Sequence, residues 1–489
     1  MRIRPISEWT LYRYRFGLSY LLLAVLVTLF IGLQSDLMPP GMGPSERESV
    51  IQSASINFSQ VPTSIVDLPY HLAQKGSVML FGITPLGVRL PSLVLGGLCA
   101  IFMALILRRW FKANVAIVAA LVVLSSAWFI GTVRLGAPFV MVPFWTSLIL
   151  LCATYVAQET KAWRLWRVLL AFTAALSFYT PFMIYLFIAA LIASLSQPHL
   201  RYLIRRSSKF GLTLGAFFFL VLLAPLGWGV YNDWSQLWQL LAIPQTLPGP
   251  VQFGSDLVRA ASSIFNPYNL SFTETITPLL SLAGVALLLM GGARLLRDSH
   301  SVRAYVLLMW GAILIPIAAF NPDNLVVLLV PSMLVTAIGV HLIINYWYKL
   351  FPLNPYARVF GLIPLAILVA VIVQFNNQRY VYSMLYSQQA ASVFNNDPFL
   401  AERAVSKLPA STTIVVVVPE GEVPLYKLAV QNRSNAQVVS PSQVNLVSGT
   451  FIVAENEVSK LATLPAPAPS SLIVNDHKDD SLRFRVYQR

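Results

Sequence analysis

The chain has 489 residues, of which 56% are hydrophobic and only 11% are charged, and its mean hydropathy is +0.67. Ordinary globular domains carry about a quarter charged residues, so this composition excludes a soluble enzyme, a disordered regulator and a secreted disulfide scaffold. The net charge of +14 comes from 34 Lys and Arg against 20 Asp and Glu. Because the basic residues lie in short clusters between apolar runs, they indicate membrane topology and predict no nucleic-acid partner.

Apolar runs long enough to cross a bilayer recur throughout residues 1–374. A hydrocarbon core about 30 Å thick needs roughly 20 apolar residues for each helix. The first run, 17–33, follows four arginines and precedes no small-residue cleavage site, so it predicts a retained helix with a cytoplasmic N-terminus. The further runs cover residues 90–107, 115–130, 140–157, 210–230, 278–292, 305–320, 325–344 and 359–373.

Residues 168–195 form an apolar segment with basic clusters on both sides, so both of its ends are predicted to be cytoplasmic. Its length is too great for one span of about 20 residues and too small for two. Tyr179-Thr180-Pro181-Phe182 lies in its middle, and proline disfavours a continuous helix there. We therefore predict two short helices that meet at an outward-facing turn, and about eleven membrane helices in all. Non-helical backbone at this depth is tolerated only around a protein-lined or water-filled cavity.

This topology places three parts of the chain outside the cytoplasm: a first outer loop at 35–89, a second at 231–277, and a tail at 375–489. The tail changes in composition, and alternating strands and helices predict a small α/β domain separate from the transmembrane domain at 1–374. Its predicted elements are a helix at 398–408, a strand at 413–418, a helix at 423–431, strands at 436–439 and 450–454, a helix at 455–461, and strands near 472–474 and 482–487.

Several motifs are absent from the sequence, and their absence narrows the function. There is no GxxxxGK[ST] loop for ATP, no HExxH or Cys/His cluster for zinc, and no Asp-x-Asp pair for a nucleotide-sugar donor. The membrane runs hold almost no ionisable residue except His341, which disfavours an ion-driven or lipid transporter, and His341 itself is predicted to be structural. The acidic turn at 476–480 favours a solvated hairpin over a metal site.

Polar residues gather instead at the predicted outer mouth of the membrane domain. Scattered loop charges are most simply solvated, but this density also fits a binding site at the membrane surface. Those of the first outer loop are Asp36, Glu46, Arg47, Glu48, Asp67, His71, Lys75 and Arg89, those of the second are Asp233, Asp256, Arg259 and Glu274, and Arg134 ends the third predicted helix.

Two motifs in the first hundred residues resemble those of a known class. Residues 38–46 read MPPGMGPSE, which is similar to the Pro-Pro-Gly-x-x-x-Asp-Glu opening of many membrane glycosyltransferases of the GT-C class. Residues 80–92 read LFGITPLGVRLPS, which resembles the LFG…RLPS signature of the same class. The class includes protein O-mannosyltransferases and bacterial lipid-sugar transferases. The layout of the chain also resembles that of the class: a large first outer loop, short paired middle helices and an outward C-terminal domain.

The resemblance implies a GT-C-like α-helical polytopic protein of the cytoplasmic membrane that transfers a sugar from a polyprenyl-phosphate donor to a glycan or protein acceptor on the outer face. An acidic residue of the first loop acts as general base, and a divalent metal is present in some members. A carboxylate suits this role because it accepts the acceptor's proton and stabilises positive charge on the sugar carbon. Arginine suits the departing phosphate because its guanidinium stays charged and binds in a bidentate manner.

The sequence departs from this pattern where Ser45-Glu46 replaces the Asp-Glu pair. We therefore predict Glu46 as the base and Asp67 as the second choice. The predicted substrate-binding residues are Glu48, His71, Arg89 and Arg134, and no metal ligand is predicted. For Arg89, an anchor at the lipid headgroups is an equally good interpretation. The alternative function is that of a catalytically inactive relative that binds lipid-linked glycan or scaffolds envelope assembly.

Overall fold

The structure is a computed structural model. It describes residues 10–32, 41–56, 65–158, 163–196, 198, 209–244, 246–265, 279–298, 301–320, 322–350, 355–386, 390, 393–409, 411–431, 433–444, 448–461, 463, 465–466, 468–474 and 481–489. The predictions for Asp36, Glu274, the basic cluster at 201–206 and the acidic turn at 476–480 lie outside these residues.

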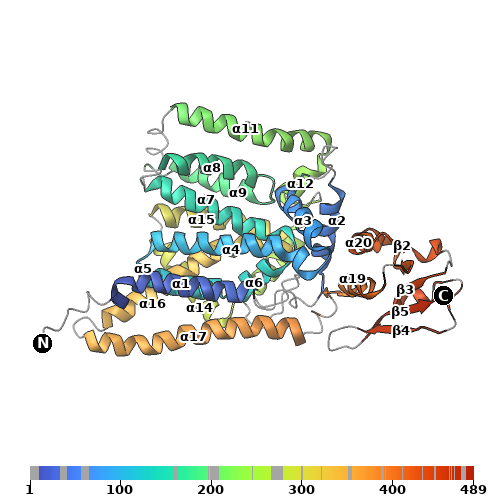
Figure 1. Cartoon of the computed structure of the whole chain (residues 1–489). Helices are drawn as coiled ribbons and strands as arrows, with labels where there is room; N and C mark the ends of the chain where they lie inside the picture. Colours follow the sequence, from blue (N-terminus) through green and yellow to red (C-terminus); the bar gives the residue numbers. More distant parts are fainter. Residues whose placement is uncertain are drawn as a thin grey trace.

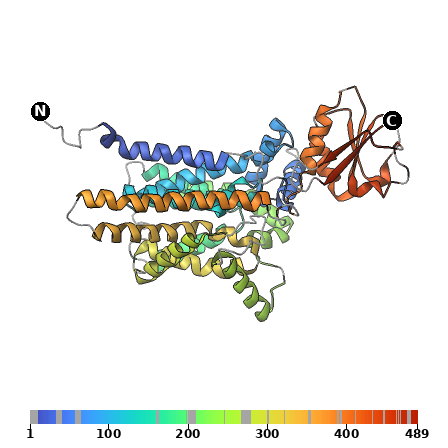
Figure 2. The same ribbon diagram turned by 90° about the horizontal axis from the view of Figure 1, so that it is seen from below.

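The larger part of the chain is a bundle of helices that run roughly alongside one another (Figure 1, Figure 2). Its helices are α1 (Thr10–Gly32), α2 (Pro44–Ser55), α3 (Leu68–Phe81), α4 (Pro85–Trp110), α5 (Ala113–Leu124), α6 (Ala127–Arg134), α7 (Met141–Ala157), α8 (Trp163–Ser177), α9 (Met183–Ser196), α11 (Lys209–Asn232), α12 (Ser235–Leu241), α13 (Pro250–Phe265), α14 (Leu282–Arg297), α15 (Val302–Phe320), α16 (Leu329–Leu350) and α17 (Pro355–Tyr386), with the 3-10 segments η2 (Pro138–Val140) and η3 (Pro322–Leu328).

The described residues contain five helices long and apolar enough to cross a membrane, or six if the pair α5 and α6, bent by 61°, counts as one span. The five are α4, η2 with α7, residues 215–232 of α11, α15, and η3 with α16. Shorter apolar stretches lie in α1, α8 and α9. The chain is thus a multi-pass, mainly helical membrane protein, and the count of about eleven spans stays a prediction.

Local sequence signals explain where these helices begin and how closely they pack. Helix α4 begins at Pro85, behind a Thr84 hydroxyl that accepts a hydrogen bond from Gly87 N at 3.0 Å. Gly291 of α14 and Gly339 of α16 bring these two helices so close that a Cβ at either position would collide with backbone of the other helix. Such small residues let helices approach closely inside a membrane, where van der Waals contact drives association.

The predicted break in residues 168–195 is present. Helix α8 ends at Ser177 and α9 begins at Met183, so the intervening turn separates two helices of 15 and 14 residues. This turn contacts the first outer loop, because Asp67 N donates to Tyr179 O at 2.7 Å. The turn and the loop therefore lie at the same end of the bundle.

The C-terminal part folds as the predicted α/β unit. Its sheet has the strand order β2-β1-β3-β5-β4, with β1 parallel to β2 and β3, and β5 antiparallel to β3 and β4. Apolar side chains of α19 and α20 cover one face of this sheet. The elements are α19 (Asp397–Lys407), β1 (Ile414–Val417), η4 (Glu420–Glu422), α20 (Val423–Ala429), β2 (Ala436–Val439), η5 (Pro441–Gln443), β3 (Thr450–Ala454), α21 (Glu455–Val458), β4 (Ser471–Val474) and β5 (Leu482–Gln488).

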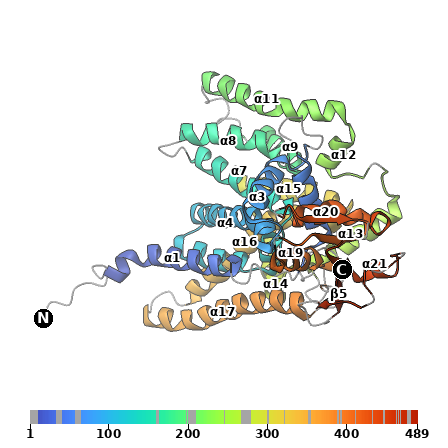
Figure 3. The same cartoon turned by 45° about the vertical axis from the view of Figure 1, so that its right-hand side comes forward.

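This α/β unit packs against the first outer loop (Figure 3). Met42 and Asn395 form an antiparallel bridge, with N–H···O distances of 2.8 and 3.0 Å. Arg47 of α2 pairs with Glu422 at 3.0 Å. An apolar cluster beside these contacts joins α2, α3 and α4 to α19 and α20, and it includes Met42, Val50, Ile83, Val88, Phe399, Leu425 and Ala429. The two parts therefore meet through a continuous packed interface.

Candidate functional site

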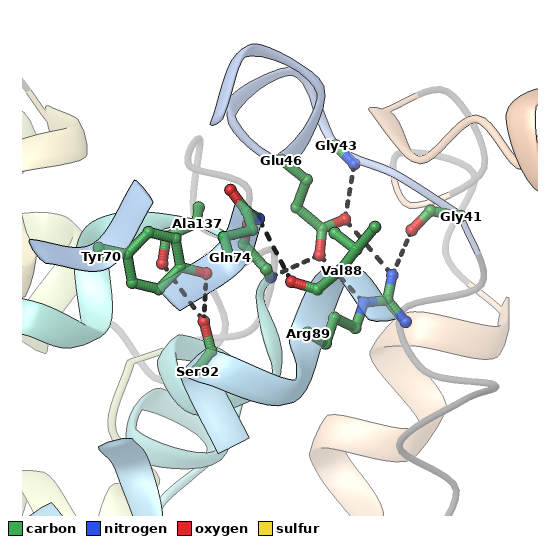
Figure 4. Close-up of polar contacts among 10 residues, drawn as sticks. Gly41, Gly43, Glu46, Tyr70, Gln74, Val88, Arg89, Ser92 and Ala137 are labelled. Carbon is green, nitrogen blue, oxygen red and sulfur yellow. Dashed lines mark hydrogen bonds and ion pairs between the residues drawn. The ribbon is translucent and has the colours of Figure 1, made fainter. Parts of the chain in front are cut away.

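Two of the predicted site residues, Glu46 and Arg89, form a buried ion pair where the first outer loop meets the membrane domain (Figure 4). Glu46 is the third residue of α2, after Pro44 at the first position, and it accepts a hydrogen bond from Gly43 N at 3.0 Å. This arrangement is the carboxylate half of a capping box, which satisfies an otherwise unpaired N–H group at the helix start. Arg89 comes from the first turns of α4.

The Glu46 carboxylate receives four N–H donors in the structure. Oε1 accepts from Arg89 Nε at 3.0 Å and from Gly136 N at 2.6 Å, while Oε2 accepts from Gly43 N at 3.0 Å and Arg89 Nη2 at 3.3 Å. Arg89 Nη2 also donates to Gly41 O. Both side chains are fully buried. Such a pair is stable only when further hydrogen bonds compensate for the loss of water around both charges, as they do here.

A second polar residue, Gln74 of α3, extends this network. Its Nε2 donates to Gly136 O at 2.8 Å and Val88 O at 3.2 Å, and its Oε1 accepts from the hydroxyls of Ser49 and Ser53 at 2.7 and 2.6 Å. Both the NH₂ group and the carbonyl oxygen of the Gln74 amide therefore have two partners each. Gln74 therefore joins α2, α3 and α4 to the segment after α6. Sequence reasoning missed it because a neutral amide carries no charge signal.

The surroundings of Glu46 weigh against its predicted role as a general base. A carboxylate oxygen that receives a proton from an acceptor hydroxyl needs a free lone pair facing the substrate. In Glu46 both oxygens already face protein donors, and the carboxylate is shielded from solvent. The same contacts engage Arg89, whose guanidinium donates to the Glu46 carboxylate and to Gly41 O. In this structure Glu46 and Arg89 therefore bind each other.

Asp67 has a different environment. It lies in the turn before α3 with φ at 53°, and only 7% of its surface is exposed. Its Oδ1 atom has no hydrogen-bond partner among the described residues. Burial raises the pKa of Asp67 to about 8, and the neighbouring Thr180 hydroxyl opposes this shift. Asp67 is thus a buried carboxyl whose proton affinity suits acid–base chemistry near neutral pH.

The other predicted residues are distributed around these two. His71 lies one helical turn after Asp67; its Nδ1 has no partner among the described residues, and burial lowers its pKa to about 4. Arg134, at the end of α6, is buried with its guanidinium carbon 5.2 Å from the ring centre of Tyr380 on α17. Glu48 is exposed and accepts from Gln52 at 3.2 Å, so it stays outside the network.

No group of three or more metal-binding side chains occurs within the described parts of the chain. Asp67 and His71 supply two such side chains on neighbouring helical turns, which is fewer than a closed protein site requires. The structure therefore offers acid–base and hydrogen-bonding groups at this end of the bundle.

Known proteins resemble this chain in part of its sequence and in its fold. Residues 69–228 match the family model described as dolichyl-phosphate-mannose-protein mannosyltransferase. The crystal structure of ArnT from Cupriavidus metallidurans bound to undecaprenyl phosphate is similar, with a TM-score of 0.57 at 15% identity, covering 96% of this chain and 98% of that chain. An oligosaccharyltransferase from Archaeoglobus fulgidus tethered with an acceptor peptide has a TM-score of 0.53 at 12% identity, covering 98% of this chain and 74% of that chain.

A search of curated proteins found no match. The family model and the solved structures together confirm the resemblance to the GT-C class of membrane glycosyltransferases that the first-loop motifs carry. At these identities the solved structures show the fold alone. The likeness extends over almost the whole chain and includes the C-terminal part.

Proposed function

We propose that the chain is a membrane glycosyltransferase that moves a sugar from a polyprenyl-phosphate carrier to an acceptor hydroxyl. The observation that carries this proposal is the whole-chain likeness to a structure bound to undecaprenyl phosphate, with 96% of this chain covered. The family model supports the same chemistry, because its description names a dolichyl-phosphate sugar as donor. Fold alone does not fix a reaction, so the assignment also needs a reactive group at the site.

Asp67 is the residue that we assign as general base. In the reaction, Asp67 accepts the proton of the acceptor hydroxyl, the acceptor oxygen bonds to the sugar carbon, and the bond from that carbon to the phosphate oxygen breaks. The lipid phosphate leaves with the electron pair of that bond. The choice of Asp67 over Glu46 rests on hydrogen bonding: Glu46 holds four N–H donors, whereas Asp67 Oδ1 has no partner among the described residues.

For the departing phosphate we assign Arg134, with the Glu46–Arg89 pair in a supporting role. Arg134 is buried at the outer end of the bent α5–α6 pair and lies over the ring of Tyr380. A guanidinium stays charged at every ordinary pH and can bind a phosphate in a bidentate manner. Arg89 instead fixes α2 on α4, which keeps the loop that carries Asp67 in place.

The experiment that tests the proposal measures transfer and lipid binding separately. The full-length protein is purified in detergent, and native mass spectrometry identifies any bound polyprenyl-phosphate sugar. Asp67→Asn should lower turnover by about a hundredfold to ten-thousandfold while lipid binding stays near that of the unmodified protein. Glu48→Gln serves as the matched control, because this exposed carboxylate lies outside the network. Equal turnover in the two variants would contradict the assignment.

A second candidate function is that of a relative that binds lipid-linked glycan without transferring it. The observation that favours it is the pair Ser45-Glu46: serine stands where the class has aspartate, and the glutamate is held in a structural ion pair. This candidate predicts bound polyprenyl-phosphate sugar and no turnover with any acceptor. If the unmodified protein neither binds polyprenyl-phosphate sugar nor transfers it, both candidates are contradicted.

We propose further that the reaction takes place on the outer face of a cytoplasmic membrane, with the N-terminus inside. The basic residues at the ends of α4 and α14 support this orientation, because such clusters stay in the cytoplasm. A cysteine at the exposed position Ser434 should then react with an impermeant reagent in intact cells, and one at Ser301 only after lysis. The reverse labelling pattern would indicate the opposite orientation in the membrane.

A further inference from the structure

Three non-glycine residues of the described chain adopt left-handed backbone conformations, and all three lie at one junction. They are Asp67 in the first outer loop, Phe182 in the α8–α9 turn and Ala242 after α12, with φ of 53°, 71° and 50°. Such conformations are uncommon for residues other than glycine, asparagine and aspartate, most of all for a bulky residue such as phenylalanine. Strained backbone of this kind is concentrated at ligand-binding and catalytic sites.

Main-chain hydrogen bonds hold the three segments together. Asp67 N donates to Tyr179 O at 2.7 Å, and Phe182 N donates to Leu240 O at 3.1 Å. The Tyr185 hydroxyl donates to Leu241 O at 2.7 Å. These bonds join the first loop to the α8–α9 turn and that turn to α12. The junction is therefore built from segments that are far apart in the sequence, and each helps to fix the others.

Two buried polar atoms at this junction have no hydrogen-bond partner among the described residues. They are Asp67 Oδ1 and the Thr180 hydroxyl oxygen, and Thr180 is 2% exposed. A buried polar group without a partner is costly, so native structures rarely keep one unless it has a functional role or binds water or another small molecule. The two side chains are neighbours, because the Asp67 N–H donates at 2.7 Å to the carbonyl of Tyr179, the residue directly before Thr180.

We infer that Asp67 and Thr180 together form a binding site for one hydroxyl group of a sugar substrate. A hydroxyl can accept a hydrogen bond from the Thr180 hydroxyl and donate one to the Asp67 carboxylate at the same time, which satisfies both unpartnered atoms. A phosphate does not suit this pair, because the Asp67 carboxylate in its ionised form repels an anion. The inference rests on the proposed transferase function and deepens it by naming Thr180 as a substrate-binding residue.

The hydroxyl can come from the transferred sugar or from the acceptor, and the two sources give different results. If it belongs to the transferred sugar, Thr180→Val should weaken binding of undecaprenyl-phosphate hexoses about tenfold and leave bare undecaprenyl phosphate unchanged. If it belongs to the acceptor, the same variant should raise the acceptor KM about tenfold and leave lipid binding unchanged. In both cases Thr180→Ser should restore the wild-type value, since it keeps the hydroxyl.

A matched control is Thr146→Val in α7. Thr146 is also buried, but its hydroxyl already donates to Val142 O at 2.6 Å within its own helix, so this variant reports the cost of losing a buried hydroxyl that already has a backbone partner. If Thr180→Val lowers only the melting temperature, as Thr146→Val does, and changes neither hexose binding nor acceptor KM, the site holds a structural water at most and the inference fails. If the unmodified protein neither transfers hexose nor prefers the hexose-bearing lipid over the bare one, the proposed function fails with it.

Discussion

Replacing Glu46 by glutamine separates a structural ion pair from a catalytic base. The carboxylate receives four N–H donors, two from Arg89 and one each from Gly43 and Gly136. Glutamine has one oxygen, and its NH₂ group would face backbone or guanidinium donors that it cannot bond. It also leaves the Arg89 guanidinium buried without a counter-charge. Removing one partner of a buried pair costs about 3–5 kcal/mol, so we expect Glu46→Gln to destabilise the protein by roughly this amount.

Thermal unfolding of the detergent-solubilised protein measures this effect, with native mass spectrometry of bound lipid on the same sample. Glu48→Gln is the control, because the exposed Glu48 contacts only Gln52 of its own helix, and such a contact contributes at most about 0.5 kcal/mol. The double variant Glu46→Leu with Arg89→Leu should recover part of the loss. Replacing both members of a buried pair by apolar side chains leaves no uncompensated charge.

One outcome would refute this reasoning. If Glu46→Gln unfolds at the same temperature as the unmodified protein and binds lipid normally, yet turns over a hundredfold to ten-thousandfold more slowly, then Glu46 is the base that the sequence predicts. Its four N–H contacts would then belong to a state that opens during turnover. A loss of stability without the double-variant recovery would assign the effect to packing rather than to charge.

Four other predictions concern the same end of the molecule. Because Asp67 must lose its proton to act as base, turnover should rise as the pH passes about 8 and then level off, and Asp67→Asn should remove this dependence. The folded pKa lies above the ordinary value of 3.8, so the folded state binds this proton more tightly, and the contribution of Asp67 to stability should fall between pH 3.8 and about 8. Gly41→Ala should loosen the C-terminal part and increase its release by protease, because the added Cβ would lie 2.5 Å from the carbonyl carbon of Asn395. A double-mutant cycle on Arg47 and Glu422 should give a coupling energy of about 0.5–1 kcal/mol, since the pair is partly exposed; zero coupling would remove it from the interface.

Much of the fold follows from patterns that the sequence displays locally. Each predicted strand and helix of the C-terminal part is present, because its apolar strands alternate with short helices and turns. Helix α17 continues to Tyr386, beyond the predicted end of the transmembrane domain at 374. Residues 375–386 are more polar but contain no glycine or proline, so the composition changes where the helix does not end.

The site was harder to predict, because its chemistry depends on contacts between distant residues. Glu46 and Arg89 are both recognisable as polar residues of a resembling motif, but their pairing across 43 positions is a property of the packed structure. The sequence marks Thr180 only as the residue before Pro181 in a predicted turn. That its hydroxyl lies buried next to Asp67 depends on how the α8–α9 turn meets the first loop, which no local pattern encodes.

The difference between a transferase and a binding protein of the same fold reduces to one group that can take a proton from an acceptor. Within the described part of the first outer loop, two carboxylates are buried, Glu46 and Asp67. Glu46 uses both oxygens to hold α2 on α4, and this task is the same whether or not the protein catalyses transfer. Serine at position 45 therefore removes a base without disturbing the scaffold. Under the proposed function, catalysis then depends on Asp67, and an Asp67→Asn variant with unchanged turnover and unchanged pH dependence would contradict that assignment.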